Sequence, residues 1–149
     1  MNISKSTGYA VHALAYMVFR NSGTPVRISE ISKFQKVSKT YLAKIFQQLA
    51  AADMVAGQRG VSGGYLLMRP SEQITLFDIV EAVEGPIEKD HCCLGILGCP
   101  VKPNCVVLGV FSHVNKSLVE NLKSITLHDI TGKMNELHAP YISEHVSAN

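Results

Sequence analysis

The chain has 149 residues, of which 46% are hydrophobic and 17% charged, so it can form one packed domain with an appendage. It contains no run of about 18 apolar residues, which argues against a membrane span, and its N-terminus lacks a signal-peptide cleavage site. We therefore expect a cytoplasmic protein with no membrane partner, whose thiols stay reduced.

Charge divides the chain into two unlike halves. Residues 1–70 carry nine Lys and Arg against two acids, a net charge of +7, whereas residues 71–149 carry five against ten, a net charge of −5. A basic half joined to an acidic half is typical of a nucleic-acid-binding module attached to a second module. A solvated basic face without a nucleic-acid partner is the alternative.

The first three expected elements are helices. The apolar spacing predicts a helix over residues 4–21, which ends at "SGTPV". A short helix follows in "RISEISKFQ", with Ser29 as its expected N-cap, and a third begins after the N-cap candidate Ser38. The apolar stripe of the third helix consists of Leu42, Ile45, Phe46 and Leu49.

Two short strands are expected next, over residues 54–58 and 65–69, around a glycine-rich turn. Gly60 and its neighbouring glycines can adopt the positive φ that a tight hairpin needs. Three helices followed by a basic hairpin indicate a winged helix-turn-helix, whose third helix enters the major groove of double-stranded DNA. A small helical domain with a surface hairpin and no DNA partner is the alternative.

The expected DNA contacts fall on the start of the third helix and on the hairpin. Base contacts are assigned to Ser38, Lys39, Thr40, Tyr41, Lys44 and Gln48. Arg27 and Arg59 are expected to hold phosphates, and the wing also includes Gly60 and Ser62.

Three further segments follow residue 70. Thr75 and Asp78 occupy capping-box positions at the start of the predicted helix "ITLFDIVEAVEG". The segment after that helix is expected to be a loop, because glycines and prolines interrupt it. A long helix is then expected from about residue 106 to about residue 124, and its apolar stripe favours a homodimer over packing on its own domain.

A last short helix is expected in "TLHDITGKMNEL", and the chain from Ala139 onward is expected to be loose. The predicted fold class is mainly α with a small β-hairpin wing. We divide the chain into a winged helix-turn-helix domain over residues 1–84, a cysteine-rich loop over 85–105, and a dimerisation helix with a C-terminal tail over 106–149. No Walker-type phosphate loop, G-x-S-x-G motif or paired acid–base set occurs, so no catalytic residue and no enzyme activity are expected.

Three stretches in this order resemble the IscR/NsrR-type winged-helix regulators of the Rrf2 family: "VSKTYLAKIFQQLAAADMV", "GVSGGYLLMRPSEQITLFDIVEAVEG" and a C-x5-C-x5-C triplet. The resemblance covers residues 9–137. It implies a homodimeric bacterial transcription regulator, here expected to be a repressor, that binds a DNA operator. It also implies that the recognition helix starts near Ser38, that the wing spans Arg59 to Gly64, and that the dimerisation helix follows the cysteine loop.

All four cysteines lie in "HCCLGILGCPVKPNC". Cys93, Cys99 and Cys105 match the cluster-binding triplet of the family, whereas Cys92 lies outside it as a possible further ligand. Three thiolates on such a loop can surround a multi-iron centre, and their spacing differs from the C-x-x-C knuckles of structural zinc sites. A metal-free regulator that switches by cysteine oxidation is the alternative, and an electron-transfer protein is a less favoured one.

The resemblance leaves the fourth cluster ligand open. Leu108 stands where IscR-type members have a histidine ligand, and Gly8 where NsrR-type members have an acid. The candidates are Cys92, His91, a residue of the other subunit such as His12, and an exogenous ligand. Because the IscR-type histidine is missing, a [4Fe-4S] cluster is favoured over [2Fe-2S]. Such a cluster would sense redox, nitric oxide or iron status.

Overall fold

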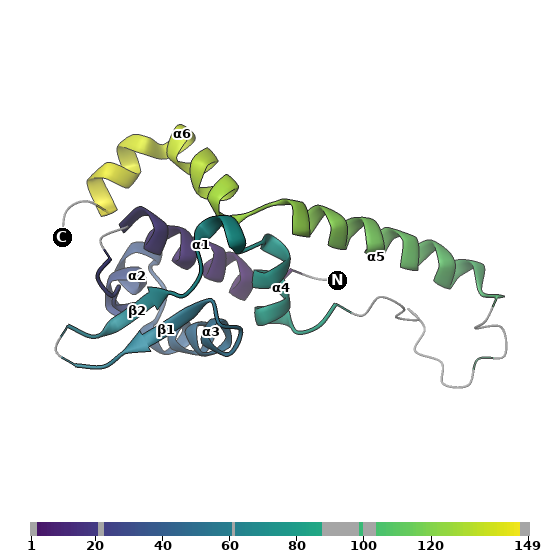
Figure 1. Ribbon diagram of the computed structural model, residues 1–149, viewed down its shortest axis with the longest axis horizontal. Helices are drawn as coiled ribbons and strands as arrows, with labels where there is room; N and C mark the ends of the chain where they lie inside the picture. The colour runs from purple at the N-terminus through teal and green to yellow at the C-terminus, as the bar shows by residue number, and fades with distance from the viewer. Residues whose placement is uncertain (1–2, 21–22, 61, 88–98, 100–103, 147–149) are drawn as a thin grey trace.

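The computed structural model describes residues 3–20, 23–60, 62–87, 99 and 104–146. Along this part of the chain the elements are α1 (Lys5–Arg20), α2 (Ile28–Gln35), α3 (Lys39–Ala51), β1 (Val55–Gln58), β2 (Gly64–Leu67), the 3-10 turn η1 (Ser71–Gln73), α4 (Leu76–Glu84), α5 (Val106–Ser124) and α6 (Leu127–Val146). The two strands form an antiparallel hairpin, and the other elements are helical (Figure 1). The predicted fold class, a mainly helical winged helix-turn-helix, is confirmed.

A left-handed residue and a helix cap build the turn between α2 and α3. Lys36 has φ 54°, and its N–H donates to the Ser32 carbonyl, which ends α2. Ser38 then caps α3, because its Oγ accepts the N–H of Tyr41 at 3.2 Å. The predicted cap at Ser38 is therefore confirmed.

The expected cap of α2 is wrong. This helix begins at Ile28, and Ser29 lies within its first turn. The cap position is Arg27, whose N–H donates to the Glu30 carboxylate at 3.4 Å. The Arg27 N–H is therefore satisfied by the side chain of Glu30, which lies within the first turn of α2.

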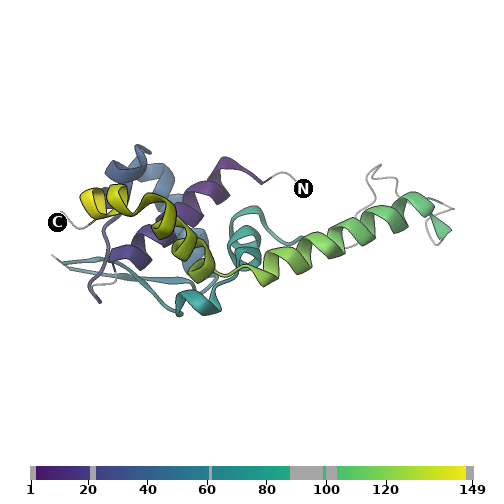
Figure 2. The ribbon, with the colours of Figure 1, turned by 90° about the horizontal axis from the view of Figure 1, so that it is seen from above.

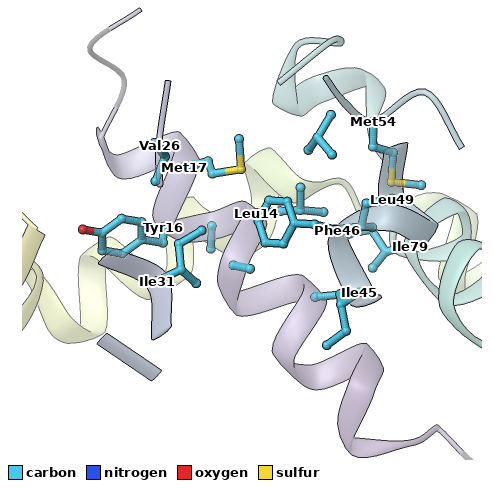
Figure 3. Packing of buried hydrophobic residues seen from close by; sticks show 14 of the residues in the cluster. Leu14, Tyr16, Met17, Val26, Ile31, Ile45, Phe46, Leu49, Met54 and Ile79 are labelled. Carbon is cyan, nitrogen blue, oxygen red and sulfur yellow. The ribbon is translucent and has the colours of Figure 1, made fainter. Parts of the chain in front are cut away.

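We call the body formed by α1–α4, the hairpin and α6 the head, and α1 lies in its hydrophobic core (Figure 3). The buried face of α1 carries alanines, which let the neighbouring helices come close. Phe46 of α3 is fully buried, and its ring centroid lies 4.6 Å from that of Tyr65 in β2. Burying a side chain such as Phe46 stabilises the fold by about 1.5–3 kcal/mol, so this packing fixes α3 against the hairpin.

Besides β1 and β2, a short extended segment at Val26 joins the hairpin to the head. The Val26 N–H donates to the Tyr65 carbonyl at 2.9 Å, and the Tyr65 N–H donates to the Val26 carbonyl at 2.8 Å. Gly64 has no room for a side chain, because a Cβ would lie 2.6 Å from the Val26 oxygen. At the hairpin tip, Gly60 has φ 115°, which favours glycine.

Capping boxes begin both α4 and α6. The Thr75 N–H donates to Asp78 Oδ2 at 3.0 Å, and the Asp78 N–H donates to Thr75 Oγ1 at 3.1 Å. Thr126 and Asp129 make the same pair of bonds at 2.9 and 3.1 Å. The box predicted at Thr75 and Asp78 is therefore confirmed, and the structure shows a second one at Thr126. An isolated antiparallel bridge between Thr75 and Thr126 places the two helix starts side by side.

The long helix α5 leaves the head and projects away from it (Figures 1 and 2). Its bounds agree with the predicted helix. Its two buried residues, Val119 and Leu122, lie near its C-terminal end, where the helix contacts α4. The Lys123 ammonium lies 4.7 Å from the centre of the Phe77 ring at the same place. The remainder of the helix therefore has little contact with its own head.

The expectation of a loose C-terminus is wrong. Helix α6 runs to Val146 and lies across α1, as Figure 2 shows. Ile142 and Val146 belong to the hydrophobic core, and Arg20 Nη1 donates to the Val146 carbonyl at 3.3 Å. The helix kinks at His138, two residues before Pro140, which directs its second half onto the head.

Candidate nucleic-acid interface

The exposed side of α3 lies opposite its buried stripe. Leu42, Ile45, Phe46 and Leu49 are buried, as the sequence predicts. Thr40, Lys44 and Gln47 are exposed and recur at four- and three-residue spacing, which places them on one helix face. Gln47 was not among the residues assigned to bases from the sequence. Its position opposite the apolar stripe is the sequence feature that marks it as a further candidate for base contact.

Three of the predicted base-reading side chains form hydrogen bonds within the protein. Ser38 Oγ accepts the N–H of Tyr41, and the Tyr41 hydroxyl oxygen lies 2.6 Å from Ser6 Oγ in a shared hydrogen bond. Gln48 Nε2 donates to the Val83 carbonyl at 3.1 Å. These three side chains therefore have structural partners, whereas Lys39, Thr40 and Lys44 are exposed in the first turns of α3.

The hairpin and its flanking chain carry further exposed candidates. Arg59, Gly60 and Ser62 are all exposed at its tip. Arg27 is also exposed, and it follows Val26, which pairs with β2. No acidic residue occurs in α3. The exposed candidates on α3 and on the wing are thus polar or basic, the chemistry that binds phosphate backbones.

The structure describes two of the four cysteines. Cys99 and Cys105 have free thiols and are half-buried. Cys105 is the N-cap of α5, and its Sγ accepts the Leu108 N–H at 3.4 Å, a position where a helix favours negative charge. Cys92 and Cys93, like His91, lie outside the described residues.

Within the described residues, no group of three or more His, Cys, Asp and Glu is arranged to hold a metal ion. The donor chemistry nevertheless fits an iron–sulfur cluster, because free thiols supply its usual ligands. Of the other positions considered, Gly8 and His12 are both exposed on α1. None of the described helices is long and apolar enough to cross a membrane.

The projecting helix α5 carries an exposed apolar face. Val107, Phe111 and Val114 recur at four- and three-residue spacing and are 53%, 47% and 56% exposed. Val106 and Val110 lie next to them and are exposed as well. No described part of this chain covers these side chains, and such an apolar face is typical of a protein–protein contact.

The sequence as a whole matches one known family. A profile described as Rrf2, iron-dependent transcriptional regulator, matches residues 3–133. The chain belongs to the Rrf2 family. The resemblance noted from the sequence motifs is therefore confirmed.

Individual relatives of the Rrf2 chain include a transcription regulator. The HTH-type transcriptional regulator IscR of Sodalis glossinidius (strain morsitans) is 32% identical over 130 residues, which cover 87% of this chain and 78% of the relative. Protein aau3 of Rhizobium meliloti (strain 1021) is 34% identical over 131 residues, 87% of this chain and 84% of the relative.

Solved structures share the fold of this Rrf2 chain. IscR of T. potens superposes with a TM-score of 0.68 at 29% identity, covering 92% of this chain and 90% of that one. CymR, the global cysteine regulator of B. subtilis, has a TM-score of 0.71 at 25% identity, covering 89% and 98%. The chain is accordingly a winged-helix transcription regulator and not an enzyme.

Proposed function

We propose that this chain is a homodimeric repressor that binds a DNA operator and responds to redox, nitric oxide or iron status through its cysteine loop. One observation carries the proposal: an acid-free polar face of α3 lies on the head, and an uncovered apolar helix projects away from it. A DNA reader and a pairing helix on one short chain suit an operator with two half-sites. Such a protein acts in the cytoplasm, where bacterial DNA lies.

The DNA-binding part of the proposal uses the exposed side chains. Thr40, Lys44 and Gln47 face away from the core and contact base edges, with Lys39 beside them. Arg59 and Arg27 hold phosphates, and Gly60 and Ser62 bring the wing backbone close to the DNA. Ser38 contributes by capping α3, so that the backbone N–H groups of the first turn are held in place.

The sensing part of the proposal uses Cys93, Cys99 and Cys105 as thiolate ligands of an iron–sulfur cluster, with [4Fe-4S] favoured over [2Fe-2S]. Two observations support it: Cys99 is a free thiol, and the Cys105 sulfur accepts a backbone N–H at the start of α5. When bound, a cluster supplies a centre that oxygen, nitric oxide or iron loss can alter. Cys92, His91, His12 of the second copy and an exogenous molecule are the candidates for the fourth ligand.

A native mass spectrum and an absorption spectrum of anaerobically purified protein test this proposal. We expect a dimer whose mass includes a cluster, with iron and acid-labile sulfide present. The triple variant Cys93→Ala, Cys99→Ala, Cys105→Ala should lose the iron and change operator occupancy. Unchanged metal content and unchanged occupancy in that variant would show that the cysteine loop is not the sensor.

The second candidate is a metal-free thiol switch, and the free thiols of Cys99 and Cys105 favour it. In that case the anaerobic protein is colourless, and its DNA affinity follows the dose of diamide and recovers with a reductant. An electron-transfer protein is a weaker candidate, because such proteins normally use four cysteine ligands.

A further inference from the structure

The recognition helix α3 is joined to the last turn of α4. Gln48 Nε2 donates to the Val83 carbonyl at 3.1 Å. Helix α4 ends at Glu84, so Val83 belongs to the last turn, whose carbonyls have no backbone N–H donor further along the helix. The Gln48 amide therefore satisfies a carbonyl at a helix end. That contact is structural, although Gln48 lies on an exposed part of α3.

The same turn of α4 is joined to the start of α1. The Glu84 carboxylate accepts the Ser4 N–H at 2.9 Å, the Ser4 hydroxyl at 2.6 Å and the buried Thr7 hydroxyl. Ser4 directly precedes α1, so this carboxylate lies at the N-terminal end of a helix, where negative charge is favoured. Glu84 thus fixes the first turn of α1 against the end of α4.

The first turns of α1 also hold the first turn of α3. The Ser6 and Tyr41 hydroxyls share a hydrogen bond at 2.6 Å. The Tyr41 ring packs edge-on against the Tyr9 ring, with centroids 5.8 Å apart. Side-chain contacts therefore join α3 to α4, α4 to α1, and α1 back to α3. We call this closed set of contacts the ring.

We propose that Tyr41, Gln48 and Glu84 are positioning residues that set the orientation of α3, whereas Thr40, Lys44 and Gln47 are the side chains that contact bases. The inference rests on the proposed function for its DNA readout. It places two residues that the sequence assigned to bases, Tyr41 and Gln48, in a supporting role. It also implies that a movement of the last turn of α4, which precedes the cysteine segment in the chain, would change the orientation of α3.

Two adjacent glutamines on α3 separate the two roles. DNA duplexes are first selected by the parent protein from a randomised library, and single-base variants of the selected sequence are then ranked by affinity. Gln47→Ala should lower discrimination at one base pair by about 5- to 150-fold, the range of a lost base contact. Gln48→Ala should lower the affinity for all duplexes by one common factor of about three- to tenfold. The ranking of the duplexes should stay unchanged.

Glu84→Gln extends the test to the α4–α1 contact. It should also weaken all duplexes uniformly, and the double variant with Gln48→Ala should lose less than the product of the two single losses, because both act on one ring. Glu81→Gln is the matched control, since the Glu81 carboxylate on the same helix has no hydrogen-bond partner among the described residues. It should bind DNA as the parent does. Thermal melting checks that all variants fold.

A changed ranking with Gln48→Ala, or parental affinity with Glu84→Gln, would overturn the inference. Amide hydrogen exchange of α3 gives a readout that needs no DNA: protection of its first turn should fall in Glu84→Gln and stay parental in Glu81→Gln. If the parent selects no sequence, the proposed function fails, and exchange alone then decides the inference. Unchanged exchange in Glu84→Gln would reject it.

Discussion

At the residue scale, the wing depends on the absence of a single side chain. Gly64 lies so close to the Val26 carbonyl that a Cβ would force the two backbones apart. The next residue, Tyr65, exchanges with Val26 the two hydrogen bonds that join the hairpin to the head. The position is therefore fixed by contact between backbones, and substitution there affects the placement of the wing.

We expect Gly64→Ala to lower the free energy of unfolding by about 2 kcal/mol, the value of two lost hydrogen bonds. Urea denaturation measures this change. Gly57→Ala in β1 is the control, because a Cβ there would meet only the Tyr65 ring at 3.6 Å, an ordinary contact. Equal stability of the two variants would show that the hairpin tolerates a wider separation from Val26.

Glu84 makes stability depend on pH. Burial opposes its ionisation, but the hydrogen bonds donated by Ser4 and Thr7 outweigh burial and lower the pKa of this carboxyl below its ordinary value. A lowered pKa in the folded state means that the stabilisation is present above the ordinary value and is lost as pH falls through the lowered one.

Stability of the parent should therefore decrease as pH falls below about 4, and Glu84→Gln should make that decrease shallower. Urea denaturation at a series of pH values compares the two proteins. Glu81→Gln serves again as the control. Parallel pH profiles for the parent and Glu84→Gln would mean that Glu84 contributes nothing to acid sensitivity.

At the scale of elements, the C-terminal helix is part of the core. Ile142 is 8% exposed and packs with the residues of α1, whereas Leu137 on the same helix is 75% exposed. Ile142→Ala should lower the free energy of unfolding by about 2–4 kcal/mol, and Leu137→Ala should change it little. Denaturation of the two variants checks this. A small effect at Ile142 would restore the expectation of a loose end.

The sequence predicts those features of the elements that act over a few residues. Ser38 and the pair Thr75 and Asp78 satisfy N–H groups within four positions of themselves, so their spacing alone identifies them. The partner of Gln48 lies 35 residues away, and Ile142 packs on a helix more than a hundred residues earlier. Such contacts have no local pattern, which explains why the hydrogen-bond partner of Gln48 and the place of the C-terminus were not predicted.

At the scale of the whole molecule, we expect two copies of the chain to pair through the apolar face of α5. Phe111→Glu places a charge in the middle of that face and should convert a dimer into a monomer, which sedimentation velocity measures. His113→Glu is the control, because His113 lies on another side of the same helix. A parent that is monomeric, or a Phe111→Glu variant that stays dimeric, would exclude α5 as the pairing surface.

The loss of pairing should also weaken operator binding, since one head then holds one half-site. Far-UV circular dichroism checks that Phe111→Glu retains its helices. Operator affinity equal to that of the parent in a monomeric variant would mean that a single head is sufficient for binding.

Because α5 is long, a small rotation at one of its ends displaces the other end by a large distance. Its 19 residues span about 28 Å at 1.5 Å per residue, and it meets the head at one end only. A tilt of about 10° at that junction moves the far end by about 5 Å, which exceeds the 3.4 Å step between neighbouring base pairs. In the proposed dimer, a small tilt at this junction therefore changes the spacing of the two heads by more than one base-pair step.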